Sequence, residues 1–256
     1  DLFHLERQTG GMTRDIERGV RGIESLVSFA FFNIVATLVE VLLVLTVLGN
    51  KLDIGFALIT LAGALAVPGI ALALPDDASA RVRQLVRWST ATADHQGLPF
   101  AVIDKPAARI HVFSAQAQWL GSAPVLLGAA AGDRSAPGIG AKPLAHIRPH
   151  ERTTPAGRFV TEPGRNLQGD DIVWIDYDAA VSLHRVRSVS AAERRLQRLA
   201  SPGARDKRIS YGCVNAPAAF YDQFIAPWFG RAPGVIYVLP DTEPFATFFE
   251  AASAYE

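Results

Sequence analysis

Two long apolar segments near the N-terminus constrain this chain most. Residues 27–49, VSFAFFNIVATLVEVLLVLTVLG, contain one acid, Glu40, and are long enough to cross a bilayer, which takes about 20 residues. A second apolar segment, 54–74, follows the polar turn NKLD and is interrupted by Pro68-Gly69. The sequence therefore predicts membrane association through residues 27–74, ahead of a domain of ordinary composition.

The second apolar segment has two interpretations. It is either the return span of a helical hairpin or the apolar part of a secretory signal, since Ala71-Leu72-Ala73 fits the small-x-small cleavage rule. Arginines precede the first span and Lys51 alone follows it, which favours a cytoplasmic N-terminus. A second span would return the following domain to the cytoplasm, whereas a cleaved signal would release it outside.

From Pro75 onward the chain is predicted to be mainly β with a few helices. Apolar residues at helical spacing over 78–93 predict one helix, inside a helical linker at 75–97. Further predicted elements are strands at 100–104, 109–115, 157–162, 171–178 and 234–240, and helices at 191–200 and at the start of 216–229. The predicted domains are 1–53 with one membrane span, 54–74, the linker 75–97, and a catalytic domain at 98–256.

Charge and cysteine content exclude several classes of protein. The 25 basic and 25 acidic side chains cancel, so no basic excess is available to hold nucleic acid. Cys213 is the only cysteine, which rules out an intramolecular disulfide and multi-cysteine zinc sites. By default a lone cysteine is a small buried hydrophobic residue.

The surroundings of Cys213, ISYGCVN, indicate a reactive thiol instead. Gly212 allows a sharp turn and a close approach of substrate to the backbone. Asn215 is a good N-cap and Pro217 suits a first helical turn, so Cys213 is predicted just ahead of a helix N-terminus that favours a thiolate. The amides of Gly212 and Cys213 are predicted to face a developing oxyanion.

A cysteine nucleophile also needs a base, which is most often histidine. The chain has six histidines. His184 follows the predicted strand at 171–178 and precedes a long connection to the cysteine, and His150 lies in a predicted loop. Both remain candidates on this reasoning.

These residues together resemble the catalytic motif of the YkuD-type L,D-transpeptidases. That motif is a His followed downstream by Ser/Thr-x-Gly-Cys-hydrophobic-Arg/Asn, which His184 and residues 210–215 match. The stretch TTPAGRF at 153–159 resembles the family's Thr-Pro-x-Gly-x-Phe segment, and 100–113 resembles its opening hairpin, so the resemblance covers about 98–240. The chain departs at Tyr211, where many members have His, and in a longer His-to-Cys separation that the helix at 191–200 explains as an insertion.

The resemblance implies an L,D-transpeptidase-like β-sandwich and a cysteine acyltransferase that acts on peptidoglycan stem peptides without a metal or cofactor. Alternatives are an L,D-carboxypeptidase and a non-catalytic peptidoglycan-binding module. The implied site residues are Cys213 as nucleophile and His184 as base, Ser210, Tyr211 and Gly212 in the oxyanion loop, and Asn215 and Arg208 as substrate or structural support.

Residues 3–61 resemble something else, namely part of the transmembrane domain of an ABC exporter of the Atm1/heavy-metal type. The sequence contains no Gly-x-x-x-x-Gly-Lys-Ser/Thr motif, so transport by this chain alone is a remote alternative. The first residue is not Met, and we expect a fragment or processed product in which an exporter segment precedes an exported enzyme, through gene fusion or an assembly error. The expected location is the periplasm or cell envelope of a bacterium.

Overall fold

The computed structural model describes residue 74, residues 78–187 and residues 190–255. The exporter-like segment 1–53 and the apolar segments at 27–49 and 54–73 lie outside these residues. Among the helices described, none has both the length and the apolar character needed to cross a membrane.

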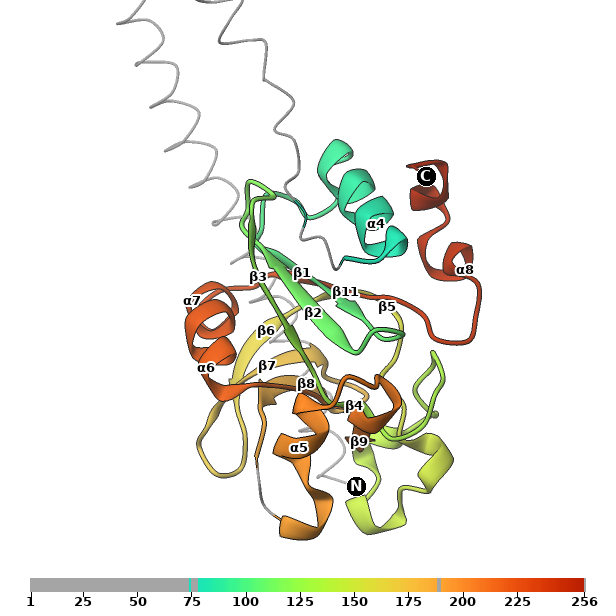
Figure 1. Cartoon of the computed structure of the whole chain (residues 1–256), viewed down its shortest axis with the longest axis vertical. Coiled ribbons are helices and arrows are strands. Elements are labelled where there is room, and N and C mark those ends of the chain that lie inside the picture. Colours follow the sequence, from blue (N-terminus) through green and yellow to red (C-terminus); the bar gives the residue numbers. More distant parts are fainter. Residues whose placement is uncertain (1–73, 75–77, 188–189, 256) are drawn as a thin grey trace, which may run out of the picture. The chain divides into compact units, whose positions relative to one another are not determined.

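The described strands form two sheets and one short pair (Figure 1). The first sheet has the order β3-β2-β1-β11-β5, with β3 at Trp119–Pro124, β2 at Arg109–Phe113, β1 at Phe100–Asp104, β11 at Val235–Val238 and β5 at Gly157–Val160. The second has the order β10-β8-β7-β6, with β10 at Val214–Ala216, β8 at Val181–Arg185, β7 at Asp171–Asp176 and β6 at Glu162–Arg165. The pair joins β4, Leu127–Gly128, to β9, Arg208–Ser210.

Helices in the described part of the chain are short. The α-helices are α4 (Ala80–Ala91), α5 (Arg195–Ala200), α6 (Ala218–Phe220), α7 (Ala226–Phe229) and α8 (Phe245–Phe249), and a π-helical turn, Tyr221–Ile225, joins α6 to α7. The 3-10 helices are Ile139–Ala141, Leu144–His146, Pro149–Glu151, Ala191–Glu193, Arg205–Lys207 and Ala251–Tyr255. The described domain is therefore mostly β with a few helices, as the sequence predicts.

The first sheet is covered on both faces. In β1, Ala101 and Ile103 face a core shared with the second sheet, whereas Phe100 and Val102 face a second core under α4 and α8. All five residues of β1 are consequently buried, which explains why FAVID reads as one nearly continuous apolar run. Figure 1 shows α4 and α8 together beside β1 and β11.

Helix α4 belongs to this packed domain. It begins after Ser79, whose hydroxyl accepts from the amide of Val82, and it buries Val82, Leu85 and Val86 in the core under the first sheet. The sequence predicts a helix here, inside a linker. The helix is present, but its apolar face lies in the core rather than along an exposed connection.

The predicted helix at 191–200 is interrupted. A 3-10 turn, Ala191–Glu193, is followed by Arg194 in the left-handed region at φ 50°, and only then by α5. This break turns the side chain of Arg195 toward β10, where it contacts Asn215.

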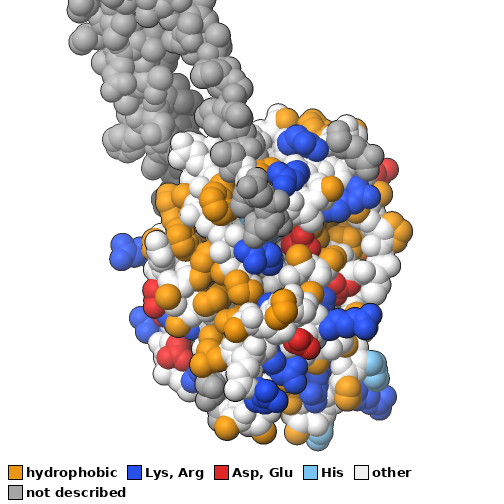
Figure 2. All heavy atoms as spheres, viewed as in Figure 1, with side chains coloured by type: hydrophobic (Ala, Val, Ile, Leu, Met, Phe, Trp, Pro, Cys, Tyr) orange, Lys and Arg blue, Asp and Glu red, His pale blue; other side chains and the backbone are white. Residues whose placement is uncertain are grey.

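Charged side chains of both signs and apolar side chains are intermixed on the face shown in Figure 2.

Candidate active site

The centre of the candidate site is one face of the parallel pair β8 and β10. Leu183 is the partner of Val214 in the register, and both are fully buried in the core between the sheets. Because side chains alternate along a strand, the polar neighbours project from the opposite face. These neighbours are Ser182 and His184 on β8, Asn215 on β10, and Cys213 directly before β10.

The nucleophile loop turns at Gly212. Its φ is +136°, and a Cβ atom there would lie 2.8 Å from the backbone oxygen of Thr153, so a glycine is required for both reasons. The hydroxyl of Ser210 accepts from the amide of Gly212 at 3.1 Å and donates to the carbonyl of Cys213 at 2.6 Å. Ser210 thereby holds the turn that presents the thiol.

The predicted helix cap at Asn215 is wrong. Asn215 lies in strand β10, fully buried, and the helix begins only at Ala218 after Pro217. Hydrogen bonds between the backbones of Leu126 and Asn215, 2.9 Å in each direction, override the local capping pattern. Cys213 therefore has no helix N-terminus directly after it to stabilise a thiolate.

Other groups lower the pKa of Cys213. Burial of the sulfur raises the pKa of the thiol. The hydrogen bond with His184, the positive charge that this imidazole carries when protonated, and the amide and hydroxyl of Ser182 lower the pKa below its usual value. The hydroxyl of Ser182 lies 3.6 Å from Sγ, and the carbonyl of Ala180 lies 3.7 Å from it. His184 and Ser182 therefore favour ionisation of the half-buried thiol, whereas the carbonyl of Ala180 accepts from the thiol in its protonated form.

The imidazole of His184 is fixed on two sides. Nδ1 lies 2.8 Å from the carbonyl of Arg185, and Nε2 lies 3.1 Å from the side-chain nitrogen of Asn215. His150, the other candidate base, is an exposed residue of the 3-10 helix Pro149–Glu151. The geometry therefore favours His184 as the partner of Cys213.

The amide of Gly212 is already used by Ser210, which corrects the predicted oxyanion site. In the same loop, the amides of Tyr211 and Cys213 have no partner among the described backbone hydrogen bonds. These two amides are the donors that remain for a developing oxyanion.

Tyr211 makes a contact that its sequence position does not suggest. The guanidinium carbon of Arg152 lies 4.2 Å from the centre of its ring, a cation–π contact, and the side chain is 37% exposed. Arg152 directly precedes the TTPAGRF segment, so this contact fastens the nucleophile loop to that segment from outside.

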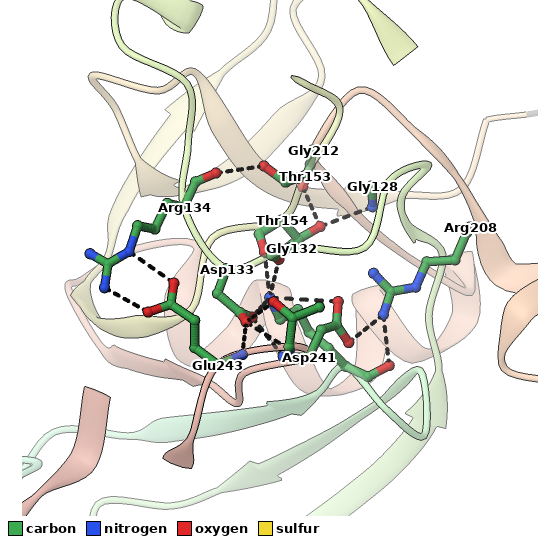
Figure 3. Close-up of polar contacts among 12 residues, drawn as sticks. Gly128, Gly132, Asp133, Arg134, Thr153, Thr154, Arg208, Gly212, Asp241 and Glu243 are labelled. Carbon is green, nitrogen blue, oxygen red and sulfur yellow. Dashed lines mark hydrogen bonds and ion pairs between the residues drawn. The ribbon is translucent and has the colours of Figure 1, made fainter. Parts of the chain in front are cut away.

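Thr154 fastens the loop from inside, as Figure 3 shows. Its hydroxyl donates to the carbonyl of Gly212 at 2.7 Å and accepts from the amide of Gly128 at 2.9 Å. Its own carbonyl accepts from the fully buried ammonium of Lys105 at 2.7 Å, and that ammonium is paired with Asp133 at 2.7 Å. The TTPAGRF segment therefore supports the nucleophile loop through a buried polar network.

Arg208 belongs to the same network. Its guanidinium donates to Asp241 at 2.6 Å and to the carbonyl of Lys105 at 3.2 Å (Figure 3). Of its two predicted roles, the contacts match structural support.

Three residues of the site escaped the sequence analysis. Ser182 lies two positions before His184 in a strand, and period-two alternation alone was a signal that could have found it. Lys105 and Arg195 gave no local signal, because their contacts join segments far apart in the sequence. Within the described residues, no three His, Cys, Asp or Glu side chains are close enough to hold a metal ion.

Comparison with curated proteins finds mitochondrial exporters. The chain is 36% identical over 100 residues to the iron-sulfur clusters transporter atm1 of Aspergillus fumigatus, and 48% identical over 59 residues to the human iron-sulfur clusters transporter ABCB7. These matches cover 39% and 23% of this chain, but the chain spans only 13% and 8% of the lengths of those proteins. No protein-family model matches the chain.

Comparison with solved structures finds L,D-transpeptidases. The Enterococcus faecium L,D-transpeptidase C442S mutant is 15% identical with a TM-score of 0.30, over 55% of this chain and 49% of that one. The L,D-transpeptidase from Mycobacterium smegmatis is 17% identical with a TM-score of 0.29, over 55% of this chain and 58% of that one. The comparisons thus find the same two groups of proteins that the sequence resembles.

Proposed function

We propose that the described domain is an L,D-transpeptidase-type β-sandwich and a cysteine acyltransferase that acts on peptidoglycan stem peptides. The observation that carries this proposal is the placement of His184 beside Cys213 on one face of β8 and β10, with the pKa of the thiol lowered. A protein that only bound stem peptides would need neither an ionisable thiol nor a histidine fixed beside it. The substrate class is inferred from resemblance, because residues 210–215 and the TTPAGRF segment resemble motifs of the L,D-transpeptidases.

The proposed reaction begins with proton transfer from Cys213 to His184. The thiolate attacks the carbonyl between the third, diamino residue of the stem and its terminal D-alanine, and the amides of Tyr211 and Cys213 hold the oxyanion. His184 then protonates the leaving nitrogen, D-alanine departs, and a thioester on Cys213 remains. A side-chain amine of a second stem resolves the thioester to a cross-link, whereas water would give a trimmed tripeptide.

The proposal extends to location and domains. Stem peptides lie in the cell envelope, so the proposed domain, 98–256 with the helix α4 that packs on it, acts there. The apolar segments within 27–74 are the proposed means of export or anchoring, and residues 1–53 are the proposed exporter-like segment.

Release of D-alanine from a tetrapeptide stem tests this function. We expect the full chain to release D-alanine and the Cys213→Ala variant to be slower by about 10⁴-fold or more, because the nucleophile is lost. Ser253→Ala, remote from the site, is the control and should match the wild type. A wild-type chain that releases no D-alanine, or an equally active Cys213→Ala variant, would refute the proposal, and the ratio of cross-linked dimer to tripeptide separates transpeptidation from hydrolysis.

A further inference from the structure

Arg195 reaches the candidate site from the insertion between β8 and β9. It is the first residue of α5, its side chain is 14% exposed, and its Nη1 donates to Oδ1 of Asn215 at 2.7 Å. Its Nε lies 2.5 Å from a carboxylate oxygen of Glu193, which holds the guanidinium from the other side. The guanidinium is therefore fixed between the insertion and β10.

Donor and acceptor chemistry fixes the orientation of the groups beyond Arg195. A guanidinium only donates, so the oxygen of Asn215 faces Arg195 and the amide nitrogen faces His184. On the far side of the imidazole, the carbonyl of Arg185 only accepts, so Nδ1 carries the proton. Both ends require the same neutral tautomer of His184, with the proton on Nδ1 and the lone pair on Nε2.

In this arrangement Nε2 of His184 is the acceptor of the hydrogen bond from Asn215. A proton on Nε2 would face the amide hydrogens of Asn215, so two donors would meet across 3.1 Å. If Asn215 were free to turn about its last side-chain bond, its oxygen would face Nε2 and would stabilise the imidazolium. The orientation of one amide thus decides whether Nε2 of His184 faces a donor or an acceptor.

The other charged groups around His184 are already paired. The guanidinium of Arg185, the next residue on β8, contacts Asp171 at 2.7 Å and Asp222 at 2.5 Å. Glu193 is paired with Arg195 on the insertion, and Cys213 lies on the loop before β10. The side-chain oxygen of Asn215 accepts from Arg195, while its nitrogen faces His184.

We propose that Arg195 is a positioning residue that locks the side chain of Asn215 and thereby keeps the ring proton of His184 on Nδ1. Its importance for acyl transfer rests on the function proposed above, but the tautomer does not depend on that function. The insertion between His184 and Cys213, which distinguishes this chain from the family it resembles, supplies this residue.

The test combines nitrogen NMR of the histidines in the full chain with the pH dependence of Cys213 alkylation by iodoacetamide. In the wild type we expect His184 to carry its proton on Nδ1. In Arg195→Met we expect the amide to turn, the imidazolium to gain stability, and the apparent pKa of alkylation to fall by about one unit, a tenfold rise in the thiolate-to-thiol ratio. Arg195→Lys, which keeps a charged donor without an acceptor, should restore most of the wild-type profile.

Arg198→Met is the matched control, because Arg198 lies on the same helix and donates to the carbonyls of Glu193 and Asp206. It should leave the tautomer and the alkylation profile unchanged. A wild-type His184 protonated on Nε2 overturns the inference, and this measurement decides even if Arg195→Met fails to fold. An Arg195→Met chain that folds with an unchanged tautomer and profile overturns it as well. If D-alanine release fails while the tautomer shifts as expected, the proposed function falls and the positioning role of Arg195 stands.

Discussion

Replacing His184 by glutamine is expected to slow acylation of Cys213 by about 10²- to 10⁴-fold at neutral pH. Glutamine can still form hydrogen bonds, but it can neither take the proton of the thiol nor support the thiolate with a positive charge. Since His184 contributes the largest of the effects that lower the thiol pKa, the apparent pKa of Cys213 should also rise. The rate of carbapenem acylation, followed by intact mass, measures the first change, and stopped-flow alkylation across a pH series measures the second.

His150→Gln is the control for this variant, because His150 is the other histidine that the sequence allows as base and it lies exposed on a 3-10 helix. It should behave as the wild type at every pH. Slow acylation in His150→Gln together with normal acylation in His184→Gln would show that His150, and not His184, is the base.

Replacing Lys105 by methionine is expected to lower the free energy of unfolding by about 3–5 kcal/mol. Burial lowers the pKa of Lys105, and its contact with Asp133, with the nearby charges, opposes that effect. Removing the ammonium would leave Asp133 without its cation and the carbonyls of Gly132 and Thr154 without a donor. Denaturant unfolding of the full chain measures the loss, which corresponds to a fall in melting temperature of roughly 10 °C.

Lys142→Met is the matched control, since Lys142 forms an ion pair of similar length, 2.8 Å, with Glu151 but is partly exposed. Surface ion pairs contribute little, so this variant should unfold almost as the wild type does. Equal stability losses in the two variants would show that the buried Lys105 pair stabilises the fold no more than an exposed ion pair does.

Because Thr154 links Lys105 to Gly212, the Lys105→Met variant should also be alkylated more slowly at Cys213 under conditions where it remains folded.

The fold was predictable where the signals are local. The opening hairpin was expected from the apolar runs at 100–104 and 109–115, and the structure places β1 and β2 there. Helix α4 likewise follows from apolar spacing and from Ser79 at its start. In these segments the local preference and the tertiary packing agree.

The site was predictable in its principal pair and not in its surroundings. Cys213 was found from its surroundings, whereas the residues alone left both His184 and His150 as candidate bases. The resemblance to the L,D-transpeptidase motif selected His184, which the structure places beside Cys213 across β8 and β10. Asn215 was misassigned because a good capping residue before Pro217 looks like a helix start, although backbone pairing with Leu126 makes it a strand residue. Lys105 was passed over because a lysine is normally exposed, and only the fold brings Asp133 to it.

The central claim is that Cys213 is an acyl-accepting nucleophile, and intact mass measurement after exposure of the full chain to a carbapenem tests it most directly. By its resemblance to the L,D-transpeptidases, the wild-type chain should gain the mass of one drug molecule, and peptide mapping should place that mass on Cys213. The Cys213→Ala variant should gain none. No adduct on the wild type, or an equal adduct on Cys213→Ala, would contradict the account.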